Sequence, residues 1–149
     1  MNFTGKTALI TGAASGMGAA TAREFRAAGG QVVIVDRNEQ LAAQVAGEID
    51  AGLPVVGDVS DPAFCAHAVE TALQRHGRLD VLVNAAGIIV RADALGTTDE
   101  QWQRVMNVNV NGVFYMSRAA IGPMKRQGHG VIVNFGSIWG SVGAAGVVA

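Results

Sequence analysis

Thr11-Gly12-Ala13-Ala14-Ser15-Gly16-Met17-Gly18 is the stretch that decides the fold of this chain. It follows the short, mostly apolar segment 6–10, which is typical of a buried parallel strand, and it precedes residues 19–25, which favour a helix. A strand, a glycine-rich turn and a helix N-terminus together form an anion site, because unbonded backbone N–H groups and the positive end of the helix dipole face the turn. The missing side chains let a pyrophosphate approach the backbone closely.

Short apolar segments alternate with helical patterns along the rest of the chain. The segments are nearly continuous runs of Val, Ile and Leu, as expected of parallel strands buried on both faces. We therefore predict a Rossmann-type, doubly wound α/β fold, a single domain over residues 1–149 with five parallel strands in the order 3-2-1-4-5. The predicted strands are residues 7–11, 31–35, 54–57, 81–84 and 130–135.

Helix start signals precede three of the predicted helices. Asn38 is placed to cap the second helix, Asp61-Pro62 opens the third, and residues 98–101 form a capping box ahead of the longest one. Pro123 is expected to kink or end that longest helix. The residues that it is expected to bury are Trp102, Met106, Val113, Met116 and Ala120.

Composition excludes several classes of function. Half of the 149 residues are apolar and the net charge is −1, so we expect no nucleic-acid partner. Cys65 is the only cysteine, which favours a reducing, cytoplasmic location. The N-terminus lacks a signal-peptide pattern, and glycines and polar residues interrupt the uncharged residues 131–149, so we also expect no membrane span. Cys65 and His67 would point to different faces of a helix, so no metal site is expected.

The glycine turn has the spacing Gly12-x-x-x-Gly16-x-Gly18. It does not match G-x-G-x-x-G, because Thr21 stands at the third small position, and no Lys-Ser/Thr pair follows it as in a P-loop. A tight turn without a ligand remains the alternative interpretation. Asp36 ends the second strand, 18 residues after Gly18, where a carboxylate can accept hydrogen bonds from both ribose hydroxyls of an adenosine.

The same carboxylate would repel a 2′-phosphate, which predicts NAD rather than NADP as the cofactor. Arg37 follows directly and would offset part of this repulsion. The alternative for Asp36 is a carboxylate that caps the next helix.

Polar and small residues also follow the third and fourth predicted strands. Asp58 could accept from an adenine amino group while Val59 packs nearby, or it could serve as a turn aspartate. In the segment Asn84-Ala85-Ala86-Gly87 the small residues allow close passage of a flat ligand, and the asparagine can tie neighbouring strands together. A purely structural turn is the alternative here.

Two further residues are candidates for chemistry. Asn109 lies in the apolar stripe of the long helix, where an amide must be hydrogen-bonded, and it either braces the sheet or holds a water. Ser137 follows the fifth strand, at the edge where α/β folds bind ligands, so its hydroxyl could bond a substrate carbonyl or alcohol. An ordinary loop serine is the alternative.

Taken together, these motifs resemble the short-chain dehydrogenase/reductase family over essentially all 149 residues. The resemblance implies a coenzyme turn at residues 11–18, an NAD-selecting acid at Asp36, and an adenine-side pair at 58–59. It implies catalytic roles for Ser137, which would orient the substrate oxygen, and Asn109, which would hold a relay water. The cofactor-binding residues that it implies are Gly12, Ser15, Gly16, Met17, Gly18, Asp36, Asp58, Val59, Asn84, Ala85, Ala86 and Gly87.

The family's remaining catalytic groups are a tyrosine and a lysine in a Y-x-x-x-K pattern, which would begin at position 150. The one tyrosine of this chain, Tyr115, does not match that spacing. We therefore expect a domain truncated relative to the family's seven-stranded fold. The resemblance implies hydride transfer between a secondary alcohol or ketone and NAD, and a full-length homodimer or homotetramer. The 149 residues alone are expected to be inactive. The alternatives are an NAD-binding module without catalysis, or a partial chain that needs its C-terminal segment to fold.

Overall fold

A parallel sheet forms the centre of the computed structural model, which describes residues 1–50, 52–140, 142–143 and 145–146. In this part of the chain the sheet has five strands, in the order β3-β2-β1-β4-β5. The predicted fold and strand order are confirmed. The strands are β1 (Thr7–Thr11), β2 (Gln31–Asp36), β3 (Leu53–Val56), β4 (Val81–Asn84) and β5 (Val131–Asn134).

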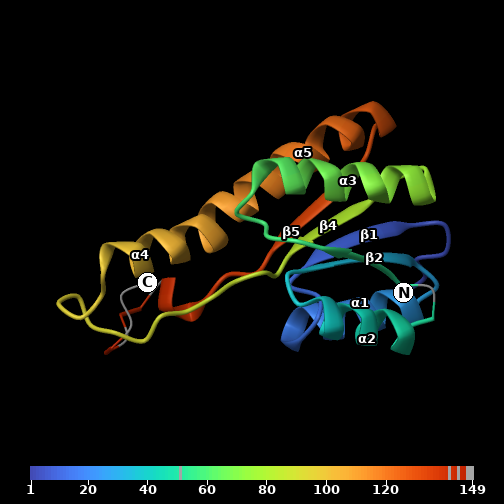
Figure 1. Ribbon diagram of the computed structural model, residues 1–149. Helices are drawn as coiled ribbons and strands as arrows, with labels where there is room; N and C mark the ends of the chain where they lie inside the picture. The colour runs from blue at the N-terminus through green and yellow to red at the C-terminus, as the bar shows by residue number, and fades with distance from the viewer. Residues whose placement is uncertain (51, 141, 144, 147–149) are drawn as a thin grey trace.

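Helices cover both faces of the sheet (Figure 1). Helices α1 (Gly16–Ala27) and α2 (Glu39–Glu48) lie on one face, and α3 (Pro62–His76) and α5 (Gly112–Gln127) lie on the other. Successive residues of β1 therefore enter two separate cores: Ala8 and Ile10 pack towards α1 and α2, whereas Leu9 packs towards α3 and α5. This explains why the strand is apolar without interruption, since both of its faces are buried.

The predicted helix starts are confirmed. Asn38 Oδ1 accepts the N–H of Leu41 at 3.0 Å, and Asp61 Oδ1 accepts the N–H of Ala63 at 2.8 Å. Thr98 caps α4 (Asp99–Met106) and forms the full capping box with Gln101. Each bond satisfies an N–H that the first helical turn leaves without a backbone partner.

The longest helix differs from the prediction, because a π-helical turn (Asn107–Asn111) separates α4 from α5. Met116 and Ala120 are buried as predicted. Trp102 is 44% exposed, and Met106 and Val113 are only half-buried. A π turn holds more residues than an α turn, so a period of 3.6 does not carry across it.

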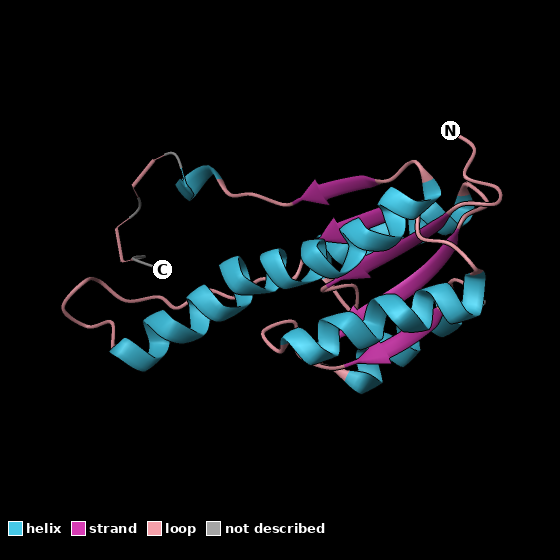
Figure 2. Cartoon of the chain, turned by 90° about the horizontal axis from the view of Figure 1, so that it is seen from above, coloured by secondary structure: helices cyan, strands magenta, loops and turns pink. Residues whose placement is uncertain are grey.

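The position of α4 is a second reason why its apolar side chains are exposed. The helix extends past the edge of the sheet, away from both cores (Figure 1, Figure 2), so its apolar side has less to pack against. Pro123 was expected to kink or end the longest helix; it lies inside α5, which continues to Gln127, so the helix does not end there. None of the helices in the described residues is long and apolar enough to cross a bilayer.

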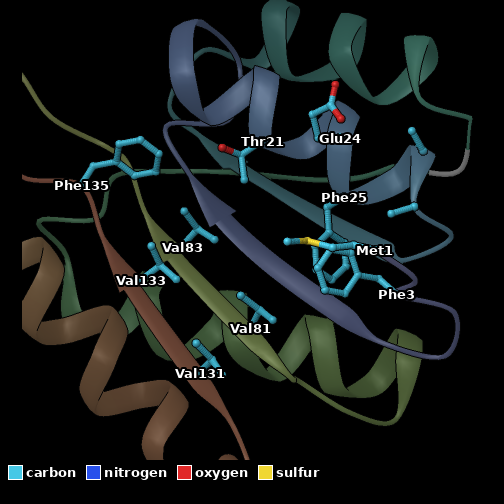
Figure 3. Close-up of a pocket in the computed structure, with 12 residues that line it drawn as sticks. Met1, Phe3, Thr21, Glu24, Phe25, Val81, Val83, Val131, Val133 and Phe135 are labelled. Carbon is cyan, nitrogen blue, oxygen red and sulfur yellow. The ribbon is translucent and has the colours of Figure 1, made fainter.

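Strand β5 is more exposed than its apolar sequence predicts. Val131 and Val133 are 56% and 43% exposed, because no helix in the described residues covers the face that they share with β4 beyond α1 (Figure 3). An open apolar hollow of about 790 Å³ lies there. Figure 3 shows Val81 and Val83 of β4 beside these two residues, with Phe25 of α1 on the opposite wall.

A buried carboxylate joins three strands at the opposite end of the sheet from the glycine turn. Asp80, which is 4% exposed, accepts the N–H of Thr7 at 2.9 Å. It also accepts from Lys6 Nζ at 3.1 Å, Arg78 Nε at 2.7 Å and His129 Nε2 at 2.8 Å. Burial by itself raises the pKa of the Asp80 carboxyl, but the hydrogen bonds, that from Arg78 first, outweigh burial and hold this pKa well below its usual range.

Asp80→Asn is therefore expected to lower the free energy of unfolding by about 2–3 kcal/mol, because the variant loses charge-assisted bonds to the starts of β1 and β5. Urea unfolding followed by circular dichroism measures the loss. Glu48→Gln is the matched control. It removes the exposed Arg23–Glu48 pair and should cost much less, because water screens that pair.

The pH dependence of the Asp80 contribution has a definite sign. A folded-state pKa below the unfolded value gives stability that is present above about pH 4 and is lost as the pH falls below it. The stability gap between the native chain and Asp80→Asn should shrink from about pH 5 towards about pH 2. A gap that widens on acidification would contradict the role given to this carboxylate.

Candidate functional site

A polar cavity of about 310 Å³ lies at the carboxyl ends of β1, β2, β3 and β4. The strand order reverses at β1, so the cavity occupies the position where open α/β sheets bind ligands. The apolar hollow beside β5 is larger but lacks converging polar groups, so we assign the functional site to the polar cavity. The residues that line it are Gly12, Ser15, Gly16, Met17, Gly18, Val35, Asp36, Arg37, Gly57, Asp58, Val59, Ala85, Ala86, Gly87, Ile88 and Val108.

The glycine turn is packed backbone against backbone. A Cβ added to Gly18 would lie 2.2 Å from the carbonyl oxygen of Gly12, and one on Gly12 would lie 2.7 Å from the Cα of Ala86. Gly12 also has a φ of +64° and Gly16 a φ of +53°, a region that other residues rarely adopt. The glycines are therefore required by geometry at this turn.

The N-terminus of α1 faces the cavity with its N–H groups available. Ser15 is the N-cap residue, but its side chain makes no hydrogen bond to the first turn, and that turn contains no acidic residue. The first N–H groups of an α-helix have no partner within the helix. The turn therefore offers an anion site that no side chain among the described residues fills, which fits the diphosphate of a dinucleotide.

Asp36 lies beside this turn at the end of β2. Its Oδ2 accepts the N–H of Ala14 at 3.1 Å, and its Oδ1 accepts the N–H of Asn38 at 3.0 Å. The α2 helix is capped by Asn38 and not by Asp36, so the capping interpretation of Asp36 is wrong. A carboxylate has about four acceptor positions, so the two backbone bonds leave room for ribose hydroxyls.

Asp58 and Val59 follow β3 at the same edge. Asp58 Oδ1 accepts the N–H of Ser60 at 2.8 Å, so this residue acts as a turn aspartate and also lines the cavity. Val59 is buried and packs against the start of α5, where a Cβ on Gly112 would lie 2.8 Å from its Cγ2. The two alternatives for Asp58 are thus compatible.

Thr11 organises the segment that follows β4. Its Oγ1 accepts the N–H groups of Ala85 and Ala86, both at 3.1 Å, and so fixes the small residues opposite Gly12. Asn84 lies outside the cavity lining. Its Nδ2 donates to Asn134 Oδ1 at 2.9 Å and to Ser117 Oγ at 3.3 Å. It therefore ties β4 to β5 and to α5, as the sequence suggests.

Asn109 is exposed and belongs to the π-helical turn, so it does not lie in a buried apolar stripe as predicted. Its side-chain amide pairs with the backbone of Ile88: Oδ1 accepts the N–H at 2.9 Å and Nδ2 donates to the carbonyl at 2.8 Å. The side chain therefore braces the segment after β4 instead of the sheet itself.

Ser137 lies three residues after β5 and is exposed. Its Oγ accepts the N–H of Trp139 at 3.2 Å, at the start of a short 3₁₀ turn (Ile138–Gly140). The structure does not place Ser137 among the residues that line the cavity. The glycine turn, Asp36, Asp58, Val59 and residues 85–87 are brought together there, whereas Ser137 and Asn84 are not.

Sequence reasoning missed several residues of this site. Thr11 belongs to the predicted coenzyme turn, but the role of its hydroxyl was not predicted, although its position at the end of a strand is a signal for that role. Ile88 and Val108 line the cavity from segments 20 residues apart, and only the fold brings them together. No cluster of three His, Cys, Asp or Glu in the described ranges could hold a metal.

Cys65 is a buried thiol that is hydrogen-bonded to the backbone. Burial raises the pKa of its thiol to about 11, and its Sγ donates to the carbonyl of Val59 at 3.2 Å. His67 is exposed whereas Cys65 is buried, so the two side chains face different ways, as the sequence predicts.

Comparison with known proteins agrees with this geometry. The family profile described as short chain dehydrogenase matches residues 6–149. A 3-alpha-(or 20-beta)-hydroxysteroid dehydrogenase of Mycobacterium tuberculosis is 43% identical over 144 residues, which are 93% of this chain and 54% of that protein. A cyclopentanol dehydrogenase of Comamonas testosteroni is 39% identical over 148 residues, 97% of this chain and 59% of that protein.

A solved structure shares the fold. The 3-ketoacyl-(acyl-carrier-protein) reductase from Brucella melitensis, crystallised as a complex with NADH, is 42% identical and superposes with a TM-score of 0.93. The match covers 97% of this chain and 62% of that one. The chain thus spans little more than half the length of the curated relatives it matches. With its glycine turn, its strand order and these matches, the chain belongs to the short-chain dehydrogenase family.

Proposed function

We propose that this chain is a single NAD-binding domain, the coenzyme-binding part of an oxidoreductase that transfers a hydride between a secondary alcohol or ketone and NAD. The observation that carries the proposal is the closely packed glycine turn, which presents the N-terminus of α1 to the cavity. The Brucella melitensis structure, which is named as an NADH complex, supports it. We also propose a cytoplasmic location and a homodimeric or homotetrameric full-length protein.

The proposed preference for NAD over NADP rests on Asp36. Its carboxylate lines the cavity beside the turn and would lie close to a 2′-phosphate, so two negative charges would meet. Arg37 also lines the cavity and offsets part of that repulsion. Asp58 and Val59 are the proposed contacts on the adenine side.

The bound nicotinamide would supply the hydride acceptor or donor. Gly87 passes beside Asn109, because a Cβ on Gly87 would meet Asn109 Oδ1 at 3.5 Å. Asn109 thus fixes the wall of the cavity through Ile88, and we propose that Ser137 orients the substrate oxygen.

Tyr115 lies on α5, half-buried, with the Arg118 guanidinium 5.3 Å from its ring centre. It does not line the cavity, so we do not propose Tyr115 as the acid or base.

A second candidate function is an NAD-binding module without catalysis. It is favoured because the cavity contains the adenosine-side residues but neither Ser137 nor a tyrosine. Binding and turnover are therefore measured separately in the experiments below.

Calorimetric titration of the chain should show NAD binding at least about tenfold tighter than NADP, an energy difference of about 1.4 kcal/mol. The reason is the repulsion between Asp36 and the 2′-phosphate. Equal affinity for the two would contradict the assigned preference. A folded chain that binds neither would contradict the proposed function.

Gly18→Ala is expected to weaken NAD binding by at least about tenfold. The added methyl would lie 2.2 Å from the Gly12 oxygen, so the turn has to shift away from the diphosphate. Gly122→Ala makes the same chemical change inside α5, where the nearest atom is 3.6 Å from the new Cβ. This control should leave NAD affinity unchanged and stabilise the helix by up to about 1 kcal/mol.

Two versions of the protein test the catalytic part of the proposal: the 149 residues, and the same chain extended through a Y-x-x-x-K segment. The extended version should reduce NAD with secondary alcohols. The shorter one should be slower by at least about 10²-fold, because it lacks the acid/base group. Comparable turnover by both would refute the need for the additional tyrosine.

A further inference from the structure

The Asp36 carboxylate accepts hydrogen bonds from the backbone of two different segments, the glycine turn and the start of α2. Its Oδ2 accepts from Ala14 in the glycine turn, and its Oδ1 accepts from Asn38 at the start of α2. One carboxylate therefore spans the space between the turn proposed to hold a diphosphate and the helix on the ribose side of the cavity.

The bond to Ala14 holds the centre of the turn. Ala14 is buried and lies between Gly12 and Gly16, two residues with positive φ. It belongs to the turn between β1 and α1, so the backbone bonds of a helix or strand do not hold its N–H. The neighbouring Ala13 N–H reaches the carbonyl of Val35 at 3.3 Å. These two bonds seat the turn on the end of β2, and the shorter of them, at 3.1 Å, comes from the Asp36 side chain.

We propose that Asp36 is a positioning residue for the diphosphate turn as well as an acceptor for the adenosine ribose. The carboxylate holds Ala14 in place, and this sets the direction of the N–H groups that follow it into α1. A hydrogen bond with a charged acceptor is about twice as strong as a neutral one. Loss of the Asp36 carboxylate should therefore loosen the backbone of the turn at Ala14.

Coenzyme preference would depend on both roles of Asp36. A neutral residue at position 36 would remove the repulsion of a 2′-phosphate, but it would also release Ala14. Asp36→Ala is therefore expected to weaken the binding of both coenzymes and not to convert the chain from NAD to NADP. This inference rests on the proposed function for its ligand, but the bond to Ala14 can be tested without one.

Amide hydrogen exchange followed by NMR tests the bond directly. In Asp36→Ala the Ala14 N–H should exchange at least about tenfold faster than in the native chain. Rates are normalised to Leu9 in β1, which reports on global unfolding. Asp36→Asn keeps one acceptor oxygen and should restore the Ala14 rate to within about threefold of native.

Asn38→Ala is the matched control for this exchange measurement. It removes the side-chain cap of α2 but keeps the backbone N–H that Asp36 accepts, so the exchange rate of Ala14 should not change. An unchanged Ala14 rate in Asp36→Ala would overturn the proposal. So would an Asp36→Asn variant that exchanges as fast as Asp36→Ala, because it would assign the protection to charge alone.

Nucleotide binding separates the two roles of the residue. ADP has the ribose hydroxyls and 2′,3′-dideoxy-ADP lacks them, so a residue that recognised only the sugar would not affect the second ligand. Asp36→Ala should weaken the binding of dideoxy-ADP by at least about threefold, and it should weaken the binding of ADP by a larger factor. Unchanged affinity for dideoxy-ADP would overturn the positioning role.

Failure of this proposal can be distinguished from failure of the proposed function. If the native chain binds neither nucleotide, the proposed function is wrong, and the exchange of Ala14 still decides whether Asp36 holds the turn.

Discussion

Direct contact between backbone segments, with no side chain between them, is the constraint on which the rest of this structure depends. The Gly12 backbone lies against Ala86, and Gly18 lies against Gly12, so β1, α1 and the segment after β4 meet at one point. Thr11 fixes one of these segments by accepting two N–H groups, and Asp36 fixes the turn from the other side. The result is a closely packed turn beside a helix N-terminus, an arrangement that suits an anion.

The elements that depend on local sequence could be predicted. β1 and β4 have the predicted bounds, and Asn38, Asp61 and Thr98 cap the predicted helices, because a cap depends on two to four neighbouring residues. The π-helical turn could not be predicted, because the spacing of apolar residues around Asn107–Asn111 is also compatible with a continuous α-helix. The pairing of Asn109 with Ile88 spans 21 residues and depends on that turn.

The polar cavity and the apolar hollow beside β5 also differ in how far the sequence reveals them. The polar cavity is formed by residues directly after strands, and parallel strands place their carboxyl ends together. Its glycines, Asp36 and Asp58 were therefore identifiable from position alone. The apolar hollow beside β5 depends on which strand faces remain uncovered, and Val131 and Val133 look the same in sequence as buried valines.

A crystal structure of this chain with NAD tests the central claim most directly. The account predicts the diphosphate within hydrogen-bonding distance of the backbone N–H groups at the start of α1, and the adenosine ribose on the Asp36 carboxylate. Coenzyme bound in the hollow beside β5, or a glycine turn closed against any ligand in a protein that binds NAD in solution, would contradict it.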